Sequence, residues 1–140
     1  MELAVEDRPD PADVAWLETR VREHTAAVTE CADEAELAIF VRDAGGAVRA
    51  GISGWTWGGC CELQHLWVDE TLRGRGLASQ LLDEAETEAA RRGCRQVVLF
   101  THEVNAGDAG DRYTRRGYEL VGRVDDYPVG DAALWFRKLL

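Results

Sequence analysis

The stretch VDETLRGRGLASQLL, residues 68–82, joins a predicted strand to a predicted helix through two glycines that alternate with arginines. Gly74 and Gly76 have no side chains, so a ligand can approach the main chain closely. The first N–H groups of a helix lack intrahelical acceptors, and with the helix dipole they bind phosphate or pyrophosphate. Arg73 and Arg75 add positive charge in a chain whose net charge is −10. The stretch therefore predicts an anion-binding turn at the start of a helix.

The hydrophobic pattern predicts a single α+β domain over residues 1–140. The expected helices cover residues 11–28, with Asp10 as cap and Pro11 in the first turn, then 75–92, ending at Gly93, and a short segment that reaches residue 116. The expected strands cover residues 1–5, 35–42, 47–57, 60–68, 95–101, 118–124 and 131–139. Because one helix separates the strands at 60–68 and 95–101, we expect these two to pair in parallel within a mixed, mostly antiparallel sheet flanked by helices.

The charge balance bears on partners and location. Sixteen Lys and Arg residues face 26 Asp and Glu residues, a balance that repels phosphate backbones, so no nucleic-acid partner is expected. The acidity favours cationic amines as ligands, or serves only to keep the protein soluble. No apolar run is long enough for a membrane span, and MELAVEDRPD (1–10) lacks the features of a signal peptide, so we expect a cytoplasmic protein without membrane association. Four cysteines without metal-ligand spacing predict reduced thiols and no metal site.

Two common phosphate-binding motifs do not fit the turn. A P-loop requires GxxxxGK[ST], which the chain lacks. A dinucleotide-binding fingerprint requires GxGxxG, but Ser79 stands where the third glycine belongs, and only one βαβ unit is expected.

The hexapeptide Arg73-Gly74-Arg75-Gly76-Leu77-Ala78 resembles the [RQ]-x-x-G-x-[GA] signature of the GNAT superfamily of N-acetyltransferases. The later string RYTRRGYELVGR (112–123) is similar to the family's Y-x-x-x-G-[FY] element. The resemblance covers residues 60–123 and the element order of nearly the whole chain. It implies a GNAT-like fold, in which the strand before the signature splays from the strand after its helix. It also implies acetyl-CoA as co-substrate, and dimers are common among the relatives.

The resemblance assigns roles to particular residues. Pantetheine would bind to the main chain of one strand end, pyrophosphate to the amides of the turn, and Tyr113 would be the general acid that protonates the departing thiolate. The cofactor-binding residues that it implies are Leu66, Trp67, Val68, Arg73, Gly74, Arg75, Gly76, Leu77, Ala78, Ser79 and Asn105. The family's usual Asn, seven residues before the tyrosine, is replaced by Ala106, with Asn105 beside it. The stretch NAGDAGDRY (105–113) is glycine-rich, and we expect a weak helix there.

The candidate general base is less specific. Strict alternation along the strand at 60–68 places Glu62 and Gln64 on one face and His65 on the other, toward the expected helix. Glu62 is therefore the preferred base, the alternative being a solvated strand glutamate, and His65 and His102 are weaker candidates. Trp55 and Trp57 are expected to wall an acceptor pocket or to pack in the core.

The sequence thus predicts an N-acetyltransferase that transfers an acetyl group from acetyl-CoA to a primary amine. We expect a small-molecule acceptor, the alternative being a protein N-terminus or lysine. The mechanism would be direct attack in a ternary complex, a covalent route through Cys60 or Cys61 being the less favoured alternative. The second hypothesis is a binding module of the same fold that holds CoA as a sensor without turnover.

Overall fold

The structure is a computed structural model that describes the backbone of residues 1–140 and the side chains of residues 1–106 and 111–140. The chain divides into two compact units, Met1–Ala32 and Asp33–Leu140. The first unit holds α1 (Pro11–Thr29), whose start is as predicted: the Asp10 carboxylate accepts a hydrogen bond from the Ala12 N–H (2.8 Å), with proline in the first turn. The strand predicted for residues 1–5 is wrong, because that stretch has no regular structure and so short an apolar run cannot distinguish strand from coil.

The second unit is a six-stranded sheet with two helices. Its strands are β1 (Ala35–Arg42), β2 (Val48–Trp57), β3 (Cys60–Val68), β4 (Gln96–His102), β5 (Glu119–Asp125) and β6 (Ala132–Leu139). Its helices are α2 (Leu77–Arg91) and α3 (Glu103–Arg115), preceded by a short 3-10 turn, η1 (Glu70–Leu72). The strand order is β1-β2-β3-β4-β6-β5, so β6 inserts between β4 and β5. The pair β3–β4 is parallel, as predicted, and the other described neighbours are antiparallel.

Local chemistry explains where these elements begin and end. Asp43 closes the β1–β2 hairpin, since one carboxylate oxygen accepts from the N–H groups of Gly45 (2.9 Å) and Ala47 (3.0 Å). The helix α2 begins two residues later than predicted because Gly74 and Gly76 take positive φ angles of 77° and 78°, outside the helical region.

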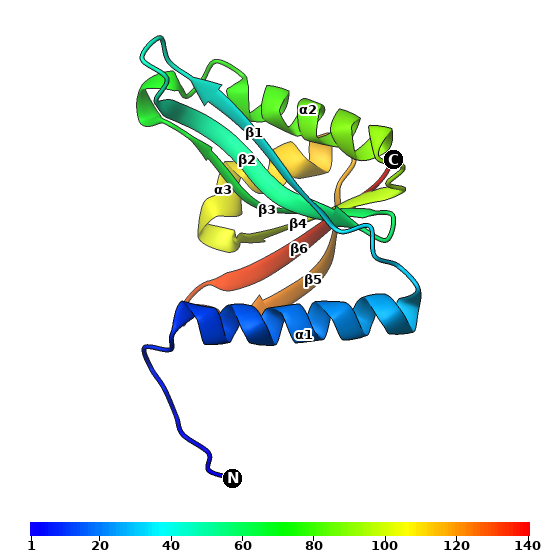
Figure 1. The fold of residues 1–140 in the computed structure, drawn as a ribbon. Coiled ribbons are helices and arrows are strands. Elements are labelled where there is room, and N and C mark those ends of the chain that lie inside the picture. Colours follow the sequence, from blue (N-terminus) through cyan, green and yellow to red (C-terminus); the bar gives the residue numbers. More distant parts are fainter. The chain divides into compact units, whose positions relative to one another are not determined.

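One face of the sheet carries the core. The helices α2 and α3 lie on the same face (Figure 1), and their buried residues join one cluster with those of the strands. Ile52 of β2 and Leu82 of α2 are almost completely buried, and each contributes about 2 kcal/mol through removal of apolar surface from water.

An ion-pair cluster fixes the end of α3. Arg116, the C-terminal cap of α3, pairs with Asp83 of α2 (2.6 Å) and with Glu86, and Lys138 of β6 pairs with the same Glu86. Glu86 is almost buried, so breaking either pair would leave a charge in a poorly solvated place. Tyr113, one turn before Arg116, is thereby held relative to both α2 and β6.

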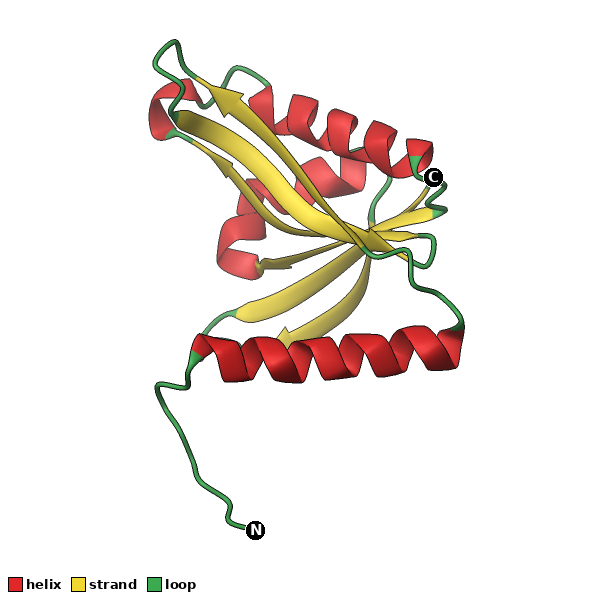
Figure 2. Ribbon diagram, in the orientation of Figure 1, coloured by secondary structure: helices red, strands yellow, loops and turns green.

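The parallel strands β3 and β4 pair along only part of their length. Pairing between β3 and β4 runs from Cys60–Gln96 to Leu63–Leu99 and stops there, although both strands continue. Figure 2 shows the two halves of the sheet meeting at one end and fanning apart at the other. The splay that the sequence resemblance implies is therefore confirmed.

A β-bulge lies at the point of separation. Ser53 of β2 pairs with His65, and Gly54 pairs with Leu63, so Gln64 has no partner on β2. An added Cβ at Gly54 would lie 1.8 Å from the Glu62 carbonyl oxygen, so the two strands approach too closely for any other residue.

The bulge reverses the alternation of side chains along β3. Leu63 before it and Leu66 and Val68 after it pack toward the core, whereas His65 is exposed on the opposite face, the face of Glu62. The prediction that His65 points toward the helices is therefore wrong, because strict alternation ignores one extra residue.

We expect Gly54→Ala to lower the free energy of unfolding by about 2 kcal/mol, because β2 must shift away from the Glu62 carbonyl. Urea denaturation of the whole chain measures this. Gly45→Ala is the matched control: its added Cβ would lie 3.4 Å from a side-chain oxygen of Asp43, an ordinary contact. Equal urea midpoints for the two variants would contradict the close approach of β2 and β3 at Gly54.

Candidate active site

A cleft of about 860 Å³ opens where β3 and β4 separate. Its lining comes from the end of β3, the turn before α2, the first residues of α2, the end of β4 and α3. Every cofactor-binding residue predicted from the sequence lines it except Arg75, which is exposed on the turn. Tyr113 lines it as well, whereas Glu62 does not.

The start of α2 presents bare amides to the cleft. The first intrahelical bond runs from the Gln80 N–H to the Gly76 carbonyl (3.0 Å), so the N–H groups of Leu77, Ala78 and Ser79 lack intrahelical acceptors. Gly76 caps the helix without a side chain, and an added Cβ on Gly76 would meet no atom within 4 Å. The turn is therefore open space bordered by donors, which suits a phosphate group.

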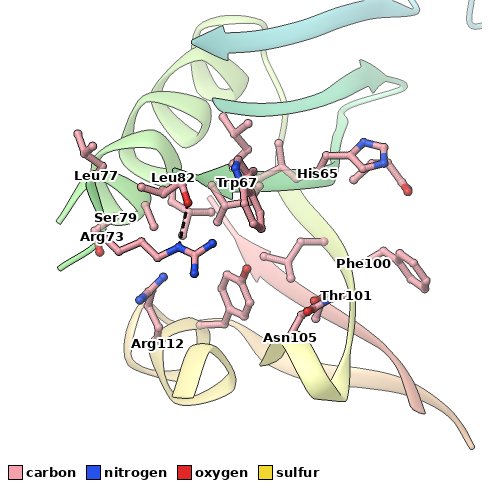
Figure 3. A pocket seen from close by; sticks show the side chains of 18 of the residues that line it. His65, Trp67, Arg73, Leu77, Ser79, Leu82, Phe100, Thr101, Asn105 and Arg112 are labelled. Carbon is pink, nitrogen blue, oxygen red and sulfur yellow. Dashed lines mark hydrogen bonds between the residues drawn. The ribbon is translucent and has the colours of Figure 1, made fainter. Parts of the chain in front are cut away.

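Two arginines stand at this opening. The Arg73 Nε donates to the Val68 carbonyl (2.9 Å), and its guanidinium lies 4.7 Å from the centroid of the Trp67 ring. Figure 3 shows Arg73 beneath Trp67, with Arg112 projecting from α3 toward the same opening. Sequence reasoning missed Arg112; its one signal was its place directly before the tyrosine of the late motif. Arg73 and Arg112 give this opening of the cleft a positive charge, although the protein as a whole is acidic.

The edge of β3 turns backbone groups toward the cleft, one of which, the Val68 carbonyl, already accepts from the Arg73 Nε. The Asp69 N–H donates to the Arg49 carbonyl of β2 (2.8 Å), and backbone direction alternates along an antiparallel pair. The amides and carbonyls of Leu66 and Val68 therefore point away from β2, on the side where β4 has separated. Trp67 contributes its side chain instead, because its main chain faces β2.

Tyr113 is fixed in the helix-covered part of the cleft. Its ring packs against Phe136 (centroids 5.4 Å apart) and Tyr118 (6.0 Å), and only 7% of the residue is exposed. Burial raises the pKa of the Tyr113 phenol, an effect that the nearby Arg112 guanidinium partly offsets. The phenol is therefore protonated at neutral pH and available as a proton donor.

Asn105 of α3 lines the cleft, while its neighbour Ala106 is buried in the core. Figure 3 shows Asn105 at the base of the opening. The helix α3 includes the whole glycine-rich stretch. The prediction of a weak helix concerns residues 107–110, whose side chains lie outside the described residues.

The cleft passes through the sheet. Leu63 and Leu99 belong to the core face, whereas His65, Phe100 and His102 lie on the other face, and all five line the same cavity. The bare amides of α2 and the side chains of Arg112 and Tyr113 on α3 therefore stand on the helix side, and the two histidines stand on the opposite side. Two reactants can enter such a cleft from opposite faces and meet where the strands part.

The predicted base and the predicted aromatic wall lie outside the lining. Glu62 is half-buried beside Trp55 of β2 and Val98 of β4. Burial raises the pKa of the Glu62 carboxyl, and a hydrogen bond from Gln64 opposes the shift. Trp55 and Trp57 belong neither to the lining nor to the buried core cluster.

The described part of the chain also shows how its metal-ligating side chains and its cysteines are placed. No group of three or more His, Cys, Asp or Glu side chains there is placed to hold a metal ion, and none of the helices is long and apolar enough to cross a membrane. Cys60, Cys61 and Cys94 form no disulfide within the described residues. Burial raises the pKa of Cys61 to about 12 and that of Cys60 in the same direction, which keeps both from acting as thiolates.

Comparison with known proteins agrees with this geometry. The model of the Acetyltransferase (GNAT) family matches residues 1–118. An acetyltransferase of Agrobacterium fabrum is 34% identical over 106 residues, covering 76% of this chain and 75% of that protein. The blasticidin-S acetyltransferase of Streptomyces morookaense is 34% identical over 131 residues, covering 90% of this chain and 86% of that protein.

A solved structure is similar to the fold over the whole chain. The crystal structure of a protein from Agrobacterium tumefaciens that is assigned as an acetyltransferase superposes with a TM-score of 0.91 at 28% identity, covering 100% of both chains. Family model, relatives, fold and cleft agree with one another and with the two motifs. The chain is a member of the GNAT family of acetyltransferases, which use acetyl-CoA as acetyl donor.

Proposed function

We propose that this protein transfers the acetyl group of acetyl-CoA to a primary amine of a small molecule, by direct attack while both substrates are bound. The single observation that carries the proposal is the cleft through the sheet, with phosphate-binding groups on one face and proton-accepting side chains on the other. The relative from Streptomyces morookaense is named for the acetylation of blasticidin S, which supports a small-molecule acceptor. The net charge of −10 favours a cationic one.

In this proposal the turn and α2 bind the pyrophosphate. The amides of Leu77, Ala78 and Ser79 would donate to the phosphate oxygens, with Arg73 and Arg112 neutralising their charge. The arm of the coenzyme would then follow the free edge of β3, bonded to the backbone of Leu66 and Val68. This path would lead from the cleft opening beside Arg73 and Arg112 toward Tyr113.

Tyr113 would protonate the sulfur as the C–S bond breaks. Its buried phenol remains protonated at neutral pH, so it can donate as the thiolate forms. Proton removal from the amine falls to Glu62 or to a histidine of the cleft. The raised pKa values of Cys60 and Cys61 support direct attack over an acyl-enzyme, because a covalent route needs a thiolate.

The test of the function is a panel of primary amines with acetyl-CoA and release of free thiol as readout. Saturable turnover of at least one small amine is expected. The alternative is a sensor that binds CoA without transfer, and it is favoured if acetyl-CoA binds tightly while no amine in the panel is acetylated.

We expect Gly76→Ala to weaken acetyl-CoA binding at least tenfold, because a side chain at a positive φ distorts the amides that hold pyrophosphate. Isothermal titration with acetyl-CoA measures this. Gly93→Ala is the matched control: Gly93 has a similar φ of 82° and equally open surroundings, but it lies at the far end of α2, outside the cleft. Both variants should lose a similar amount of folding stability. If both also lost the same affinity for acetyl-CoA, the start of α2 would not be the pyrophosphate-binding site.

We expect Tyr113→Phe to lower kcat by about 100-fold with little change in the KM for acetyl-CoA, because it removes only the proton donor. Steady-state kinetics on the best amine of the panel measures both constants. Since the pKa of Tyr113 is raised, activity that depends on its proton should persist through neutral pH and be lost only as pH rises past the ordinary value of about 10.

Tyr118→Phe is the control for Tyr113→Phe. Tyr118 packs against Tyr113, but its buried hydroxyl has no hydrogen-bond partner among the described residues, and Tyr118 does not line the cleft. Its loss should leave kcat within about threefold. An equal effect of the two substitutions would mean that packing, and not proton donation, explains the result.

A further inference from the structure

Few side chains of the cleft can accept a proton from an attacking amine. The titratable side chains among its described lining are His65, Arg73, His102, Arg112 and Tyr113. Arginines stay charged, and the pKa of Tyr113 is raised, so neither type is a base at neutral pH. The histidines remain, and imidazole is the side chain that most readily gains and loses a proton near neutrality.

We propose that His102 is the general base of the acetyl transfer, a role for which the sequence alone favoured Glu62. This inference rests on the proposed function. Its first support is position: His102 is the last residue of β4, three residues beyond the last paired residue, Leu99, and so lies on the separated part of the strand. It lines the cleft on the sheet face opposite the helices, whereas Tyr113 lines it on the helix side.

Its second support is a fixed tautomer. The His102 Nδ1 lies 2.9 Å from the backbone carbonyl of Tyr127. A carbonyl oxygen only accepts, so Nδ1 carries the proton, and the lone pair of the neutral ring resides on Nε2. A backbone carbonyl behind an imidazole in this way orients the ring, so that Nε2 is the nitrogen left to accept a proton.

Its third support is a fixed ring. The His102 ring makes edge contacts with Phe100 (centroids 5.2 Å apart) and Tyr127 (5.5 Å). The residues that follow are tied to the β5–β6 hairpin: Glu103 pairs with Arg123 (3.0 Å), and the Val104 N–H donates to Asp131 (3.0 Å). Anchors in the ring, the strand and the next helix leave Nε2 little freedom to move.

His65 lacks these supports. It lies on the same sheet face and lines the same cleft, but it is exposed, and no hydrogen bond or ring contact fixes it within the described residues. Glu62 has its carboxyl beside Gln64 and does not line the cleft.

The step balances with these two groups. The amine nitrogen attacks the thioester carbon, the C–N bond forms, and the C–S bond breaks. From a protonated amine the His102 Nε2 first takes one proton, which it releases to solvent. It then takes the second N–H proton as the C–N bond forms, while the Tyr113 hydroxyl gives its proton to sulfur; an amine that is already neutral needs only the second transfer. Exchange with solvent then returns the imidazolium and the phenolate to their starting states, leaving acetylated amine and free CoA.

The substitution that tests this is His102→Asn. The asparagine amide can still donate to the Tyr127 carbonyl in place of Nδ1–H, but it has no basic nitrogen. For an alkylamine that is protonated at pH 7, we expect kcat/KM to fall by about 100-fold. The affinity for acetyl-CoA and the thermal midpoint should stay close to those of the parent, which separates a chemical loss from misfolding.

Two further measurements distinguish a base from a structural residue. With methoxyamine, which is already neutral at pH 7, the loss in His102→Asn should shrink at least tenfold, because less deprotonation is needed. In His102→Ala, added imidazole should restore part of the rate with the alkylamine. A structural role predicts an equal loss with both acceptors and no rescue.

Parallel variants test the rivals. The inference is overturned if His102→Asn keeps activity within threefold of the parent, or if the acceptor-dependent loss and the rescue are found in His65→Asn or Glu62→Gln instead. If the parent chain acetylates no amine while binding acetyl-CoA, the proposed function fails and this inference fails with it. Turnover by the parent with an unaffected His102→Asn removes this inference alone.

Discussion

The separation of β3 from β4 after Leu63 and Leu99 is the constraint on which the rest of this structure depends. If β3 and β4 stayed paired along their whole length, the backbone groups of Leu66 and Val68 would form hydrogen bonds to β4, and no cavity would remain between the strands. The bulge at Gln64 and the close crossing at Gly54 lie at the branch point, where they bend β3 away and reverse its side chains. Backbone donors, a cavity and a passage through the sheet all follow from this one break in pairing.

The break also sorts the chemistry by face. On the helix side lie the bare amides of α2, Arg112 and the buried phenol of Tyr113, all suited to an anionic thioester substrate. The opposite side carries imidazole and aromatic rings in an otherwise acidic molecule. An amine and an acetyl donor arriving from opposite faces need no shared entrance, which is consistent with direct transfer while both are bound.

The sequence predicted the parts of the fold that have local causes. The Asp10 cap, the glycine turns and the parallel β3–β4 pair each follow from a short sequence pattern, and so does the start of α2 at a glycine without a side-chain cap. Two features were missed because they depend on contacts distant in sequence: the insertion of β6 between β4 and β5, and the bulge that moved His65 to the other face. The tie between His102 and the Tyr127 carbonyl spans 25 residues and leaves no mark in the sequence.

The central claim is that the coenzyme lies in the gap between β3 and β4. A crystal structure of this protein with bound acetyl-CoA tests it most directly. The account predicts diphosphate oxygens within hydrogen-bond distance of the amides at the start of α2, and the thioester sulfur beside the Tyr113 hydroxyl. A coenzyme bound on another surface, or a sulfur out of reach of Tyr113, would contradict it.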